Sequence, residues 1–242
     1  LKEDALFDRG NLNVFDGSKA TAHNDLTFTW LYSGLMVRAA ELTVEGKVTK
    51  VPTTDECVDS QNKDGKGDFT ITTGAKVHFK DEVDLYSTAL KIDDGNAFSH
   101  SSSLPIHGGI ENQPVAGWGK GNSRPSTVIA EKSIILKGKE SEFALIGSGL
   151  KINENFTINE DGMDFFTLGG KLKVEGEKGL SFKAPANAVL LATDFDLSTI
   201  TVSEGGKVLA AANDLKVDND FVLEKDVQFI DATTADGSEK GG

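Results

Sequence analysis

The chain of 242 residues carries 38 acidic and 25 basic side chains, which gives it a net charge of −13. Only three of the basic residues are arginine, so the chain lacks the dense cationic surface that nucleic-acid binding requires. The negative charge also disfavours an anionic membrane surface, and no run of about 18 apolar residues predicts a membrane span. Because Cys57 is the only cysteine, the sequence excludes an intramolecular disulfide and a cysteine-based metal cluster.

Short segments in which apolar and polar residues alternate run along the chain and predict an all-β fold. They are rich in β-branched and aromatic residues, and glycine, asparagine and aspartate separate them. The stretch 31–42 is the one that fits helical spacing, and a β interpretation of it is nearly as good. The predicted strands are 12–15, 26–30, 42–44, 69–72, 76–79, 83–86, 90–92, 127–129, 133–136, 143–146, 156–158, 165–168, 180–182, 189–191, 199–202 and 221–223.

A tripeptide of leucine, lysine and a β-branched residue recurs at a nearly constant interval. Leu150 begins one copy, Leu172 begins the next 22 residues later, and Leu215 begins another 43 residues further on. Leu90 begins a copy 60 residues before Leu150, and Leu42 begins a looser one. Repeats of this length are typical of coils stacked along an axis, because one coil of two or three strands needs about 20 residues.

This period favours a parallel β-solenoid with coils of about 20 to 22 residues. The alternative fold is an antiparallel β-sandwich or jelly roll, which has no reason to repeat a sequence register at this interval. In a solenoid the leucines of the tripeptides point into the core, whereas Lys151, Lys173 and Lys216 point outward. The 14 phenylalanines, against two tryptophans and two tyrosines, suit a dry interior stack.

Three segments depart from the regular rhythm. Residues 1–33 are expected to form an N-terminal cap or a strand segment exchanged with a neighbouring copy, and residues 34–232 to form the solenoid body. Within that body, residues 96–126 are rich in Ser, Gly, Pro, His and Trp and predict an inserted loop. Residues 233–242 predict a flexible tail.

An acidic stretch between two predicted strands is the best candidate for a metal site. Residues 62–68 resemble the middle of an EF-hand-type calcium loop, with oxygen ligands two residues apart and glycine at the bend. Ser60 and Ile71 stand where that loop requires its first Asp and its bidentate Glu, so an acidic solvated turn is the competing interpretation. Calcium is the only cofactor candidate. The candidate ligands are Asp59, Asn62, Asp64 and Asp68.

Two pairs of carboxylates lie two residues apart, Asp194 with Asp196 and Asp218 with Asp220. Side chains at this spacing share one face of a strand, and a glycoside hydrolase requires two carboxylates at a suitable separation. Such pairs arise often by chance among 38 acidic residues, and neither pair has an Arg or His close in sequence. The chain also lacks the nucleophile-elbow, phosphate-loop and dinucleotide motifs, so no catalytic residue is assigned.

These features predict a non-enzymatic structural or adhesive protein that is secreted or displayed on a bacterial or archaeal surface. In architecture the chain resembles extracellular β-solenoids, which are commonly adhesins, surface-layer or sheath components, or fibre subunits. Self-association into a fibre, sheath or layer is therefore expected, and the start at Leu1 rather than Met is expected of a mature form. The alternative is a carbohydrate-binding module or a polysaccharide hydrolase or lyase, in which Trp118 stacks on a sugar and the partner is a glycan or cell-wall surface.

Overall fold

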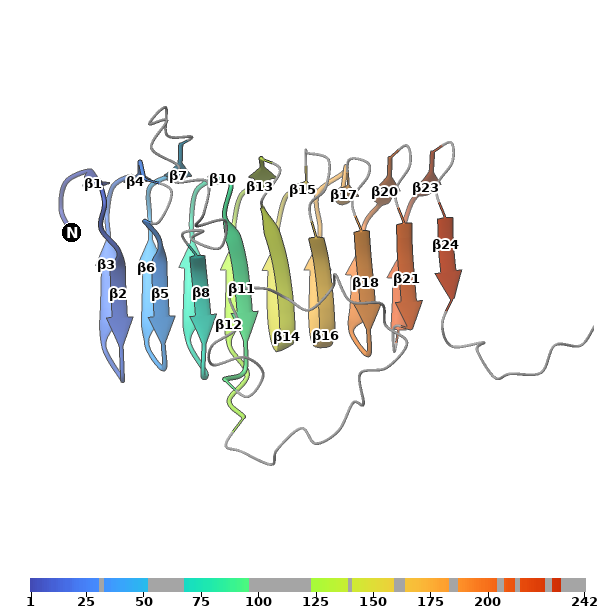
Figure 1. Cartoon of the computed structure of the whole chain (residues 1–242), viewed down its shortest axis with the longest axis horizontal. Coiled ribbons are helices and arrows are strands. Elements are labelled where there is room, and N and C mark those ends of the chain that lie inside the picture. Colours follow the sequence, from blue (N-terminus) through green and yellow to red (C-terminus); the bar gives the residue numbers. More distant parts are fainter. Residues whose placement is uncertain are drawn as a thin grey trace, which may run out of the picture.

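The computed structural model of the chain is a stack of parallel β-strands, with no helix among the residues that it describes. Figure 1 shows the strands stacked along one axis, from the N-terminal strands at one end to the C-terminal strands at the other. The fold is a parallel β-solenoid with a repeat of about 22 residues, as the sequence predicts. The structure describes residues 1–30, 33–51, 68–95, 123–138, 141–158, 164–182, 187–203, 207–211, 214–224 and 228–231.

Successive turns of the solenoid place their strands on three faces, two of which belong to one 15-stranded sheet. Face 1 is a separate nine-stranded sheet of β1 (Ala5–Phe7), β4 (Leu26–Phe28), β7 (Val48–Lys50), β10 (Val83–Tyr86), β13 (Ile134–Lys137), β15 (Phe156–Ile158), β17 (Leu180–Phe182), β20 (Ile200–Val202) and β23 (Phe221–Leu223). Face 2 consists of β2 (Leu12–Phe15), β5 (Leu35–Arg38), β8 (Asp68–Thr72), β11 (Ala89–Asp93), the first halves of β14 (Glu142–Ile152) and β16 (Asp164–Val174), β18 (Asn187–Leu191), β21 (Lys207–Ala211) and β24 (Gln228–Asp231). Face 3 consists of β3 (Lys19–Ala22), β6 (Glu41–Val44), β9 (Lys76–Phe79), β12 (Thr127–Ala130), the second halves of β14 and β16, β19 (Asp194–Leu197) and β22 (Asp214–Val217).

The repeated leucines mark equivalent inward positions on face 3. Leu150 pairs in register with Leu172, which pairs with Phe195, and Phe195 pairs with Leu215. Leu150 and Leu172 are buried, and Leu215 packs against the same core at the last strand of the face. Leu42 belongs to this ladder through the strands between β6 and β14. The predicted equivalence of these positions is therefore confirmed.

Leu90 does not belong to this ladder, and its assignment as a further copy is wrong. It pairs with Phe69 and Phe143 on face 2. The tripeptide shows only that its side chains point inward, outward and inward in turn. Strands on every face of the solenoid have this alternation, so the tripeptide does not identify the face. The interval of 60 residues to Leu150 also includes residues 96–122, which lie between two strands and outside the described residues.

The stretch 31–42 forms strands in the part that the structure describes, β5 and the beginning of β6. In β5 the buried Leu35 and Val37 alternate with the exposed Met36 and Arg38. This period of two is that of a half-buried strand, so the β interpretation is confirmed and the helical one is wrong.

The segment predicted as a cap, residues 1–33, contributes β1 to β4 to the same stack. Ala5 on β1 pairs with Leu26, and Lys19 on β3 pairs with Glu41. The first turn therefore follows the register of the second turn of the same chain.

Two other predicted segments fall largely or wholly outside the described residues. In the predicted insertion, 96–126, only residues 123–126 are described, where the chain runs into β12. The predicted tail, 233–242, is not described at all. Over the described ranges, the chain has no helix with the length and apolar character needed to cross a bilayer.

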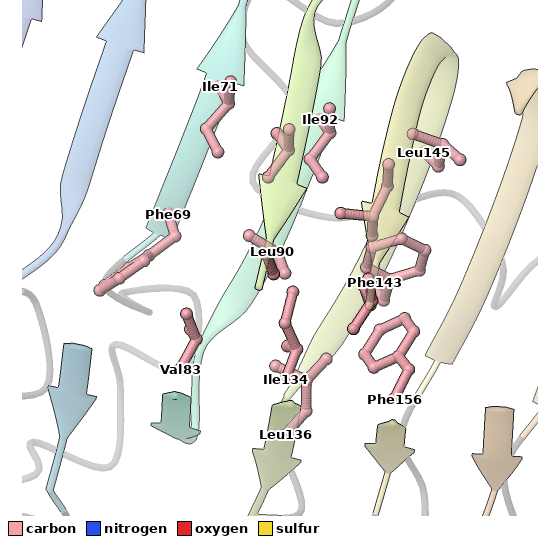
Figure 2. Packing of buried hydrophobic residues seen from close by; sticks show 14 of the residues in the cluster. Phe69, Ile71, Val83, Leu90, Ile92, Ile134, Leu136, Phe143, Leu145 and Phe156 are labelled. Carbon is pink, nitrogen blue, oxygen red and sulfur yellow. The ribbon is translucent and has the colours of Figure 1, made fainter. Parts of the chain in front are cut away.

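Phenylalanine fills much of the interior, as the composition predicts. The ring of Phe143 lies 4.9 Å from that of Phe156 and 4.8 Å from that of Phe165, between ring centroids. Figure 2 shows Phe143 of β14 turned toward Phe156 of β15 across the core. Because each aromatic ring buries a large apolar area, these stacks are a main source of stability. The phenylalanines among the largest fully buried side chains are Phe28, Phe69, Phe79, Phe143, Phe156, Phe165 and Phe195.

Candidate functional site

The outward side of face 3 carries ion pairs that follow the solenoid axis. Glu175 lies 3.0 Å from Lys173, between carboxylate oxygen and ammonium nitrogen. Asp196 joins Lys173 at 3.3 Å to Lys216 at 3.2 Å, and Lys216 reaches Asp218 at 2.8 Å. We call this set, together with Lys151 at 3.2 Å from Glu175, the charge ladder. Its members are Lys151, Lys173, Glu175, Asp196, Lys216 and Asp218.

Parallel register explains why charges of opposite sign meet along this face. Residues at the same position in successive turns are only about 4.8 Å apart, so an uninterrupted row of lysines would repel itself. Carboxylates on the neighbouring positions relieve that repulsion. The side chains of Lys151, Lys173 and Lys216 are 43%, 35% and 57% exposed, so their predicted outward orientation is confirmed.

Replacement of Lys173 by alanine should have little effect on stability. The side chain is outward, its partners are accessible to water, and surface ion pairs stabilise folded proteins only weakly. We expect the melting temperature, followed by circular dichroism, to change by less than about 2 °C. A fall comparable to that of a core substitution would show that the charge ladder acts as a cooperative unit.

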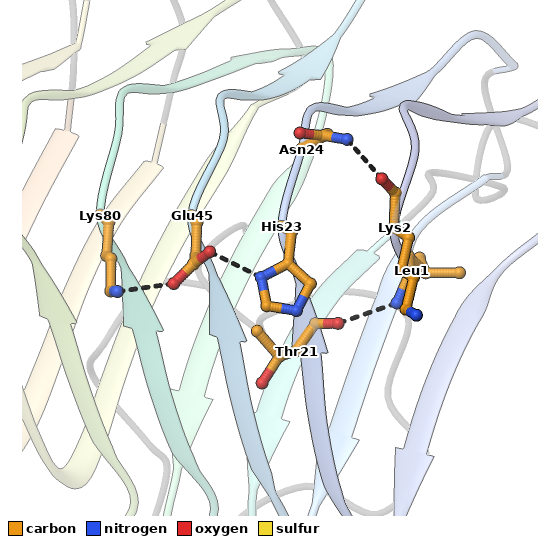
Figure 3. A network of polar contacts seen from close by, with 7 residues as sticks. All are labelled: Leu1, Lys2, Thr21, His23, Asn24, Glu45 and Lys80. Carbon is orange, nitrogen blue, oxygen red and sulfur yellow. Dashed lines mark hydrogen bonds and ion pairs between the residues drawn. The ribbon is translucent and has the colours of Figure 1, made fainter.

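A second network surrounds Glu45 near the N-terminal end (Figure 3). Its carboxylate lies 2.7 Å from His23 Nδ1 and accepts a hydrogen bond of 2.7 Å from Lys80 Nζ. The hydrogen bond from Lys80, and then that from His23, lowers the pKa of Glu45 to about 2. Beside this network, the amino group of Leu1 donates to the Thr21 carbonyl oxygen at 2.8 Å. The backbone N–H of His23 donates to the Leu1 carbonyl oxygen at 3.0 Å, so Leu1 is hydrogen-bonded to the chain at the C-terminal end of β3.

Acid should destabilise the protein because of these ion pairs. The pKa of Glu45 is lowered from its usual 4.5 to about 2, and those of Glu41, Glu175 and Asp196 are also lowered, chiefly by hydrogen bonds from lysines. Groups with a depressed pKa in the folded state stabilise it above their unfolded pKa, and this contribution disappears as the pH falls toward the folded pKa. We therefore expect a melting temperature that is level near neutrality and falls between about pH 4.5 and pH 2.

The control for the acid experiment is Glu45→Gln, which removes one titrating carboxylate while keeping the shape of the side chain. Its melting temperature should be lower at neutral pH and should fall less steeply between pH 4.5 and pH 2, the range set by the two pKa values of Glu45. A melting temperature of the unaltered chain that stays level throughout this range would contradict the prediction.

One carboxylate of each pair considered for glycoside chemistry forms an ion pair with lysine. The hydrogen bond from Lys216, the largest cause, lowers the pKa of Asp196, and Lys173 acts in the same direction. A carboxyl group that is ionised near neutral pH is unsuited to protonate a leaving group. In the second pair, Asp218 is bound by Lys216. Sequence proximity did not reveal the lysines around Asp196, because Lys173 and Lys216 come from neighbouring turns.

Of the candidate metal ligands, only Asp68 lies among the described residues. Asp59, Asn62 and Asp64 lie outside the described residues. Asp68, the first residue of β8, lies 2.8 Å from Lys91, between its Oδ2 and the lysine Nζ. In the described part of the chain, no group of three or more His, Cys, Asp or Glu side chains is arranged to hold a metal ion. Calcium binding stays a prediction.

One buried cation was not identified from the sequence. Lys50 on β7 points inward and is 3% exposed, in register between Phe28 and Leu85. Burial lowers the pKa of Lys50 to about 8, while the charge of Asp68 acts in the opposite direction. The signal was present, because Lys50 and the buried Val48 are two residues apart and therefore share a strand face.

The two ends of the solenoid differ from its middle. β1 and β23 are the first and last strands of face 1, so each has a neighbour on only one side among the described strands. On β1, the side chain of Leu6 is 67% exposed. On β23, Val222 and Leu223 are 39% and 43% exposed. The first and last described strands of face 1 thus carry exposed apolar side chains, a feature that favours contact with another surface.

Comparison with protein-family models, with curated protein sequences and with solved structures gives no significant match for this chain.

Proposed function

We propose that the chain is a non-enzymatic structural or adhesive protein of a bacterial or archaeal surface, whose solenoids associate into a fibre, sheath or layer. The observation that carries the proposal is the pair of apolar strand edges at β1 and β23. Among the described strands of face 1, β1 and β23 each pair on one side only, and monomeric proteins usually protect edge strands with charge, proline or a covering segment. Here Leu6, Val222 and Leu223 are exposed apolar side chains, which do not protect a strand from pairing.

The regular interior supports a mechanical role. Each turn contacts only its neighbours, so the length of the body grows by addition of turns and its stability is roughly the sum of contacts between adjacent turns. The charge ladder and the phenylalanine stacks both run along the axis and join successive turns. A rigid rod is the shape that results from this construction.

Secretion or display at the cell surface is part of the same proposal. The chain has one cysteine and therefore no intramolecular disulfide, so its fold does not depend on the redox state of the compartment.

Light scattering and electron microscopy of the purified chain test the proposal. We expect particle mass to increase with protein concentration and elongated or sheet-like assemblies to appear in the images. Dispersed monomers at every concentration would contradict the proposal, and their retention on a polysaccharide would favour the carbohydrate-binding alternative.

A further inference from the structure

We draw no further inference here: the strongest candidate, the apolar outward side of face 2 over β14, β16, β18 and β21, which includes Ile146, Phe166, Leu168 and Leu191, carries none because nothing in the described part of the structure shows what covers it.

Discussion

Replacement of Leu172 by aspartate should abolish the native fold. Leu172 is fully buried in the middle of the face 3 ladder, in register with Leu150 on one side and Phe195 on the other. Loss of the apolar side chain alone costs about 2 to 5 kcal/mol, and an unpaired carboxylate in the core adds several more. The sum is comparable to the whole free energy of unfolding of a typical domain, about 5 to 15 kcal/mol.

Circular dichroism and urea denaturation would measure this effect. The matched control is Ser181→Asp, which introduces the same charge on an outward, half-buried position of β17. We expect Ser181→Asp to unfold at nearly the urea concentration of the unaltered chain, and Leu172→Asp to lack a cooperative transition. A folded Leu172→Asp variant with an unchanged transition would contradict the assignment of this ladder to the core.

The substitution Gly170→Ala should destabilise the protein by about 3 kcal/mol or more. At this corner, β16 passes from face 2 to face 3 while it stays paired with β14, and Gly170 has a φ of +84°. A Cβ atom at this position would lie 2.0 Å from the Ser148 carbonyl oxygen of the adjacent turn. The backbone of β14 would have to move, and the left-handed conformation itself disfavours alanine.

Gly149→Ala is a close control, because it lies on the partner strand near the same corner. Its Cβ would have no atom within 4 Å and its φ is not positive. Since glycine in a strand interior is less favourable than alanine, we expect this variant to be unchanged or slightly more stable, by at most about 1 kcal/mol. Thermal unfolding of the two variants should therefore give shifts of very different size. Equal shifts would contradict the close approach of the two strands at Gly170.

The sequence predicts the class of fold because each strand carries its own burial pattern. The alternation within 76–79, 83–86 and 156–158 gives three strands whose bounds agree with β9, β10 and β15. The interval between Leu150 and Leu172 then predicts stacking, because both the local pattern and the period require the same arrangement. Parallel stacking follows from repetition of the register and not from any single motif.

Other features depend on which strands become neighbours. The prediction ended a strand at residue 146, but β14 continues to Ile152, because Gly147 turns the corner with a φ of +56° without ending the pairing with β16. The strand β3 was missed because Lys19–Ala22 has two alanines in place of large apolar residues. Local propensity is a weak guide where pairing to the next turn supplies the structure.

The charge ladder could not be predicted for the same reason. Lys173 and Asp196 are far apart in the sequence and meet only because β16 and β19 pair in one register. The repeat placed Lys173 outward but gave no information about its partner in the next turn, Asp196. Knowledge of the register was therefore required to assign both the ion pairs and the apolar positions at the two ends.

We propose that these solenoids associate along their own axis. X-ray diffraction from aligned assemblies of the purified chain tests it most directly, because adjacent strands are about 4.8 Å apart in the stacking direction. We predict fibres with a reflection near 4.8 Å along the fibre axis, since the strands then lie across the fibre. The same reflection perpendicular to the fibre axis, or a failure of the chain to form assemblies that align, would contradict the account.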